Sequence, residues 1–167
     1  KNTRKIYLKP LGDTKWGEAN ARFAAYAFEG DTDNEWMSMT KIDDGDDDTR
    51  NDVYECDVWV KYEKIIFCRM DGSNSTNNWG NKWNQTDDQT INYPCNLFDL
   101  DQADWPSTGK WSEYGAWHLA GNFNSWGDLC GYDFTENKEN NTFVYTLNLN
   151  PGEYEFKITN SASWYGN

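Results

Sequence analysis

Carboxylates are the first residues in this sequence whose type and number could do chemistry. The chain has 28 Asp and Glu among 167 residues, and glycoside hydrolysis uses a pair of such groups. A hydrolase also needs one carboxyl held among apolar groups, so that its pKa rises. Here the acids fall mostly in polar turns or on outer strand faces, so we expect no enzyme, and a small glycosidase acting on α-glucan is kept as an alternative.

A run of aspartates at residues 43–48 could bind a cation. Calcium prefers hard oxygen ligands, and Asp43, Asp44, Asp46 and Asp48 would supply them at turn spacing. The run lacks the spacing and the closing Glu of an EF-hand. Because Gly and Asp also suit a solvated hairpin turn, we favour the turn and keep a calcium-dependent adhesin as a further alternative.

Other chemistries are disfavoured by composition. One His and four spread Cys, without a Cys-x-x-Cys pair, speak against zinc and against Ser-His-Asp catalysis. A net charge of -13 repels nucleic acid and anionic membranes, and no stretch approaches the roughly 18 apolar residues of a membrane span. We therefore expect no cofactor, no nucleic acid and no membrane insertion, and a neutral or cationic partner.

Aromatic residues in polar surroundings suggest a different chemistry. Trp79 and Trp83 lie with Lys82 in a loop of amide side chains at 77–86. Flat rings beside amides and a cation suit a neutral sugar, because a ring covers the C–H face while polar groups bind the hydroxyls. Trp36 would point outward in the same way if Met37 and its alternate neighbour Met39 face the core; a Trp plugging the core is the alternative.

The remaining composition explains how such a chain folds. Leu, Ile, Val and Phe make up only 26 of 167 residues, a fraction that with high net charge usually indicates disorder. The 10 Trp, 10 Tyr and 8 Phe offset this deficit, since large rings bury much area each. We assign a structural role by default to five tryptophans: Trp16, Trp59, Trp105, Trp111 and Trp117.

The elements that would position these rings are strands. Period-two runs at 6–8, 22–28, 53–60, 65–70, 143–149 and 154–158 are separated by turn residues, which predicts an all-β protein built of antiparallel β-sandwiches. A break in the pattern places a boundary near residue 113, giving units 1–113 and 114–167. The second is short for independent folding, so we expect it to be incomplete or to pack on the first.

The sequence pattern predicts two β-hairpins. A turn over Val60–Lys64 would pair Cys56 with Cys68, which allows a disulfide, although we favour two buried thiols there. No partner is inferred for Cys95 or Cys130. A turn at 150–152 would join 143–149 to 154–158, burying alternate rings and turning Lys157 outward.

The first unit resembles a known family. The segments that carry the resemblance are 6–10, 21–26, 36–40, 53–56, 65–70 and 77–86, together with Trp16. As a set they look like the family 26-type starch-binding modules attached to amylases and starch-scavenging proteins of gut Firmicutes. The resemblance implies that Tyr26 and Trp36 stack on adjacent glucoses. Trp79, Lys82 and Trp83 are added from their local chemistry.

The second unit is similar to another set of modules. The segments 117–126 and 151–158, followed by Trp164, are similar to starch and glycogen modules of families 20 and 48 and to the repeats beside pullulanases. The resemblance implies that Trp126 and Trp164 form a stacking platform and that Lys157 donates to glucose hydroxyls. Those families continue for further strands, so we expect the second unit to lack an edge strand and its site to be incomplete.

Together these resemblances imply a non-catalytic, extracellular protein, secreted or associated with the cell surface. Its partners would be starch, amylopectin and maltooligosaccharides. The expected architecture is two tandem immunoglobulin-like β-sandwiches within a larger secreted multi-module protein, like the amylosome adaptor proteins of gut Ruminococcus.

Overall fold

The fold is seen in a computed structural model, which describes residues 1–12, 14–18, 20–43, 45, 49–126, 130–132, 134–160 and 163–166. Within these residues the chain is all-β, with short 3₁₀ turns and no α-helix, so the predicted fold class is confirmed. No helix in the described part is long and apolar enough to span a membrane.

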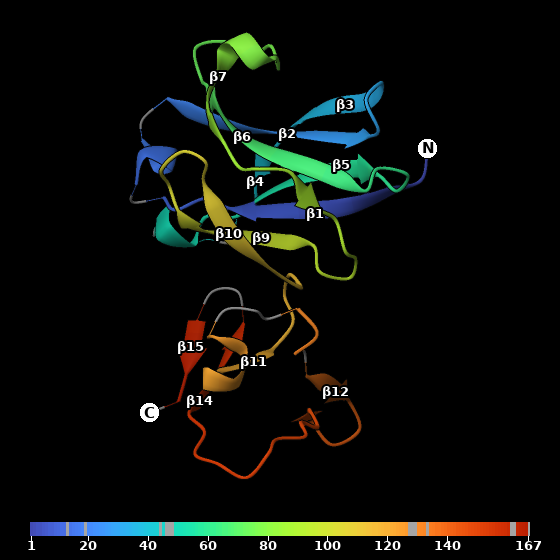
Figure 1. The fold of residues 1–167 in the computed structure, drawn as a ribbon, viewed down its shortest axis with the longest axis vertical. Helices are drawn as coiled ribbons and strands as arrows, with labels where there is room; N and C mark the ends of the chain where they lie inside the picture. Colours follow the sequence, from blue (N-terminus) through green and yellow to red (C-terminus); the bar gives the residue numbers. More distant parts are fainter. Residues whose placement is uncertain are drawn as a thin grey trace.

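Residues 1–113, here called the first region, form two five-stranded sheets (Figure 1). Sheet I has the strand order β10 (Thr108–Ser112), β9 (Leu97–Gln102), β1 (Thr3–Lys9), β5 (Tyr54–Trp59) and β4 (Thr40–Lys41). Sheet II has the order β3 (Asp33–Ser38), β2 (Ala21–Glu29), β6 (Lys64–Asp71) and β7 (Lys82–Gln85), and β8 (Gln89–Thr90) also pairs with β6. The pairs are antiparallel except β1 with β9.

The main core lies between these sheets. Ile6 and Phe98 from sheet I and Phe23 and Phe67 from sheet II belong to one buried cluster. The rings of Phe67 and Phe98 stack across the interface with centroids 5.2 Å apart. Aromatic rings thus supply much of the core volume that the few aliphatic residues leave unfilled.

Strand β6 is buried on both faces. Ile65 and Phe67 enter the main core, while Ile66, Cys68 and Met70 form a second buried cluster on the outer face of sheet II. Tyr26, Phe28 and Trp36 pack against this outer cluster.

The hairpin predicted over residues 54–70 is wrong. Strand β5 pairs with β1 and β4 in sheet I, whereas β6 pairs with β2, β7 and β8 in sheet II. Both edges of β6 are already occupied, so the turn at 60–63 carries the chain from one sheet to the other. Alternating polarity in two consecutive strands does not tell whether they share a sheet.

The cysteines follow from this topology. Cys56 and Cys68 are free, buried thiols in different clusters, which confirms the favoured prediction of two thiols over a disulfide. Burial raises the pKa of each thiol to about 12. Cys95 and Cys130 form a disulfide across a separation of 35 residues, a pairing the sequence analysis did not infer. This bond joins the first region to the rest of the chain.

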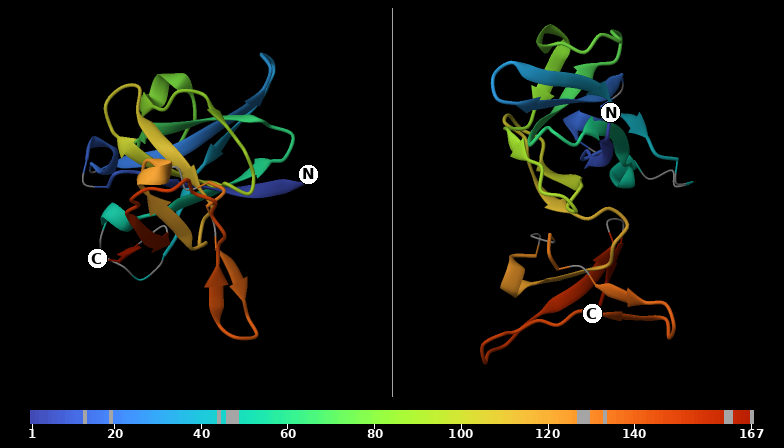
Figure 2. Two further views of the ribbon diagram at one scale, coloured as in Figure 1. Left: turned by 60° about the horizontal axis from the view of Figure 1, so that its bottom comes forward. Right: turned by 90° about the vertical axis from the view of Figure 1, so that its right-hand side faces the viewer.

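Residues 114–167, here called the second region, lie below the two sheets in Figure 1. They form a three-stranded sheet of β11 (His118–Gly121), β14 (Phe156–Asn160) and β15 (Ser163–Tyr165) and a separate hairpin of β12 (Thr135–Asn137) and β13 (Thr142–Val144). Figure 2 shows this hairpin projecting away from the three-stranded sheet.

The hairpin predicted at 150–152 is also wrong. Strand β14 pairs with β11 and β15, so both of its edges are occupied, and β13 pairs with β12 instead. The rings expected to be buried are exposed, including Phe143, Tyr154 and Phe156. Lys157 is half-buried on the face that also carries buried Thr159, opposite to the outward face predicted for it.

Candidate functional site

Three aromatic rings meet on the outer face of sheet II. Tyr26 on β2 lies directly across from Trp36 on β3, and their ring centroids are 5.0 Å apart. Trp79, from the 3₁₀ turn η3 (Trp79–Asn81), lies 4.8 Å from Tyr26 and 4.7 Å from Trp36. We call these three residues the aromatic cluster.

Strand alternation explains why two of the rings face outward. On β2, Ala25 and Ala27 enter the main core, so the intervening Tyr26 points to the opposite face. On β3 and just after it, Met37 and Met39 pack on the main core while Trp36 packs on the outer cluster. The predicted outward orientation of Trp36 is confirmed.

The third ring is held by an anchored loop. Arg22 Nη2 donates to the carbonyl of Thr76 at 2.9 Å, and Asn77 Nδ2 donates to Ser38 Oγ at 3.1 Å, which attaches the loop to β2 and β3. The Asn78 side chain caps η3 by accepting from Asn81 N at 2.9 Å. These hydrogen bonds hold the loop in place, while the Trp79 side chain itself is 44% exposed.

Lys82 borders the aromatic cluster. Its Nζ lies 5.1 Å from the centroid of the Trp79 ring and 4.7 Å from that of Trp105. It also donates to Gln85 Oε1. A cation held over two rings is attracted by their negative faces, so the ammonium is fixed at the edge of the cluster.

Trp83 lies away from the cluster, contrary to its grouping with Trp79 in the sequence analysis. Its ring packs over the Arg69 guanidinium, with 4.7 Å between the ring centroid and Arg69 Cζ. Arg69 Nη2 donates to Glu18 Oε2 at 3.2 Å, and alternation along β6 places Arg69 on the face opposite to Cys68 and Met70. A Trp that covers a guanidinium has a structural explanation.

Of the five tryptophans given structural roles, Trp105 is the most exposed, and Trp117 lines an apolar hollow of the second region. Trp16 is fully buried, and Trp59 and Trp111 pack against the main core. Trp105 is 59% exposed. It is flanked by Asp104 and Pro106, a polar turn context like that of Trp79, and that signal could have identified it.

No known family model, curated protein or solved structure matches this chain. The resemblances to starch-binding modules therefore stay predictions, and the geometry of the site is what bears on function.

The three rings of the aromatic cluster are steeply inclined to one another. The interplanar angles are 56° for Tyr26 with Trp36, 62° for Tyr26 with Trp79 and 65° for Trp36 with Trp79. The rings consequently form an angled surface rather than a flat one. Lys82, Gln85 and Asn77 place hydrogen-bonding groups around it.

The carboxyl group with a raised pKa lies elsewhere. Burial raises the pKa of Asp99, the Lys9 ammonium lowers it, and Asp101 raises it. Asp99 is on β9 in sheet I, whereas the aromatic cluster is on the outer face of sheet II. Among the described residues, no carboxyl of raised pKa accompanies the rings.

The predicted calcium ligands are only partly described. Asp43 Oδ1 accepts from Gly45 N at 3.1 Å, as in a turn, whereas Asp44, Asp46 and Asp48 lie outside the described residues. In the part of the chain that is described, no group of three or more His, Cys, Asp or Glu could hold a metal ion.

The predicted residues of the second site are spread over separate elements. Trp126, 37% exposed, follows the 3₁₀ turn η4 (Asn122–Asn124), and its N–H donates to the Gly121 carbonyl at 3.0 Å. Its φ of 62° is unusual for a bulky residue. Lys157 pairs with Ala120 on β11, and Trp164 pairs through its backbone with Thr159 while its side chain lies outside the described residues.

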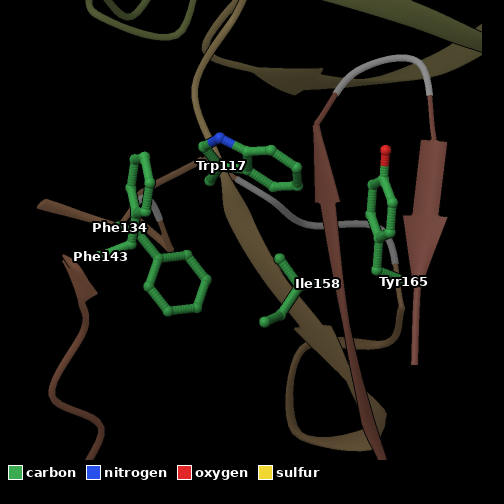
Figure 3. Close-up of a pocket in the computed structure, with 5 residues that line it drawn as sticks. All are labelled: Trp117, Phe134, Phe143, Ile158 and Tyr165. Carbon is green, nitrogen blue, oxygen red and sulfur yellow. The ribbon is translucent and has the colours of Figure 1, made fainter. Parts of the chain in front are cut away.

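An apolar hollow of about 260 Å³ opens on the second region (Figure 3). Its walls are the rings and aliphatic side chains of Trp117, Phe134, Phe143, Ile158 and Tyr165. Sequence reasoning missed this hollow, because it assigned Phe143 and Ile158 to a buried hairpin face.

Proposed function

We propose that this protein binds starch and maltooligosaccharides without catalysis, through the aromatic cluster of the first region. The observation that supports the proposal is the set of three rings, Tyr26, Trp36 and Trp79, gathered within 5.0 Å of one another on a supported sheet face. Aromatic side chains gain most from burial in the core. Three of them held at a surface, beside fixed polar groups, form a surface suited to ligand stacking.

The angles between the rings favour an α-glucan over a flat polysaccharide. Chains of α-1,4-linked glucose curve, so successive sugar faces change direction. Rings inclined at 56° and 65° can follow such a curve, whereas a flat cellulose chain would contact only one of them at a time.

Polar groups at the rim suit glucose hydroxyls. Among the described residues, Gln85 Oε1 accepts a hydrogen bond from one of the three N–H groups of the Lys82 ammonium. The remaining donors lie beside the Trp79 ring, where a stacked sugar would present its hydroxyls. The net charge of -13 does not oppose a neutral ligand.

The expected affinity is modest. Covering one ring contributes on the order of 1 kcal/mol at roughly 25 cal/mol per Å². Two or three stacks with a few hydrogen bonds imply a Kd between about a micromolar and a millimolar. Binding of that strength is useful when many sites act on one polymer.

We also propose an extracellular location. The Cys95–Cys130 disulfide supports it, since such bonds persist mainly in oxidising compartments. The proposal includes membership of a larger secreted, multi-module assembly, in which this chain contributes binding.

Affinity electrophoresis tests the proposed function. Native gels containing amylopectin, pullulan, dextran or xylan are run with the wild type, Trp36→Ala and Trp83→Ala. We expect amylopectin to retard the wild type and Trp36→Ala to weaken this about tenfold, the effect of one lost stack. Trp83→Ala is the control because that Trp is 45% exposed, close to the 44% of Trp79, but lies away from the cluster.

Three results would contradict the proposal. Migration of the wild type unchanged by every α-glucan gel would remove starch binding altogether. Release of reducing sugar from starch, abolished by one Asp or Glu substitution, would indicate the glycosidase alternative. Loss of protein binding with EDTA, without any response to maltooligosaccharides, would support the calcium-dependent adhesin.

A further inference from the structure

Trp105 combines high exposure with a firmly held backbone. At 59% it is more exposed than Trp79 at 44%. An exposed large ring on a loose loop needs no explanation, but this one sits on a short loop with many fixed hydrogen bonds. The combination indicates that the ring is displayed.

Three hydrogen bonds fasten the loop at 103–107. Asn84 Nδ2 on β7 donates to the Ala103 carbonyl at 2.7 Å, and Ser107 N donates to the Gln85 carbonyl at 3.0 Å. Ser107 Oγ accepts from the buried indole Nε1 of Trp16 at 2.9 Å. These bonds connect the loop to both the edge of sheet II and the main core, and none involves the Trp105 ring.

Lys82 connects this ring to the aromatic cluster. Its Nζ lies 5.1 Å from the Trp79 centroid and 4.7 Å from the Trp105 centroid, so the two ring centres are separated by no more than the sum of these distances. Once the first sugars of a chain cover the cluster, the sugars that follow would reach Trp105, and the ammonium between the two rings would face their hydroxyls.

We propose that Trp105 forms an additional sugar subsite, extending the aromatic cluster past Lys82 so that the protein selects longer α-glucan segments over short oligosaccharides. The inference rests on the proposed function and goes further by naming a residue that sets the length of ligand recognised. Short ligands occupy the cluster alone, and longer ones reach Trp105.

Calorimetric titration with maltotriose and maltoheptaose tests this inference. The variants are Trp105→Ala, Trp105→Phe, Trp36→Ala and the control Trp83→Ala. We expect Trp105→Ala to bind maltotriose within about twofold of the wild type and maltoheptaose about tenfold more weakly. Trp105→Phe should recover most of the lost affinity, because a smaller ring still stacks. The melting temperature should stay unchanged, since the loop hydrogen bonds do not use the ring.

The outcomes separate the two proposals. Equal loss for both sugars, or loss for neither, in Trp105→Ala would overturn the additional subsite while Trp36→Ala still weakens binding and upholds the proposed function. If the wild type binds neither sugar, the proposed function fails and the subsite fails with it. A selective loss that Trp105→Phe does not repair would also contradict stacking by this residue.

Discussion

Both regions of this molecule place apolar residues at alternate strand positions, and they differ in what packs against those residues. In the first region, Phe67 on sheet II meets Phe98 on sheet I and both are fully buried. In the second region, Phe156 and Ile158 on β14 are 58% and 36% exposed, and Ile158 lines an open apolar hollow.

The difference shows that an alternating pattern specifies a strand with two unlike faces but does not provide the layer that covers the apolar one. Sheets are stabilised by packing that face against a second layer. The first region has ten strands in two sheets to do so. In the described part of the second region, a three-stranded sheet and a separate hairpin leave the face open.

A pair of matched substitutions tests whether the two apolar faces are packed differently. We expect Phe67→Ala to cost about 3 to 5 kcal/mol of unfolding free energy, the usual cost of removing a large ring from a packed core. Phe156→Ala should cost less than about 0.5 kcal/mol, because its ring is largely solvated. Chemical denaturation followed by circular dichroism measures both. Similar costs for the two variants would show that the faces are packed alike.

The disulfide tests how the two regions depend on each other. Replacing both Cys95 and Cys130 by Ser should lower the free energy of unfolding by about 3 to 4 kcal/mol, since the bond closes a loop of 35 residues. We expect the loss to appear mainly in the second region, as faster proteolysis after residue 114. The free thiols Cys56 and Cys68 supply the control, because their replacement by Ala leaves the link between regions intact. Uniform protease resistance with and without the bond would contradict this expectation.

Asp99 gives the smallest effect and reports on burial at the outer face of sheet I, because its neighbours Phe98 and Leu100 on β9 enter the main core. Burial raises the pKa of its carboxyl above the ordinary value of 3.8. Because the folded-state pKa is the higher one, the penalty for ionising Asp99 is absent below the unfolded-state pKa, grows as the pH rises, and is complete above the folded-state pKa. Asp99→Asn should therefore raise the melting temperature at pH 7 but not at pH 3.

Thermal denaturation at the two pH values checks this, with Asp31→Asn in an exposed turn as the control. An equal change at pH 3 and pH 7 would mean that ionisation of Asp99 is not the cause.

Much of the candidate site was predictable from local pattern. Alternation around Met37 placed Trp36 on the outer face, and the polar setting of Trp79 marked it as a displayed ring. Trp83 shares that polar setting yet covers Arg69 instead, and Trp105 was assigned to structure although it neighbours Lys82. Trp83 and Trp105 differ from Trp79 in their tertiary contacts, and sequence spacing does not specify such contacts.

The all-β class and the inward and outward faces of single strands follow from local sequence, because both depend on the two-residue period of an extended backbone. Which strands share a sheet, which cysteines meet and which rings form a surface is set only when the chain folds. Those outcomes depend on pairings between distant residues, since a strand with two occupied edges, such as β6 or β14, excludes a neighbour that the local pattern would have allowed.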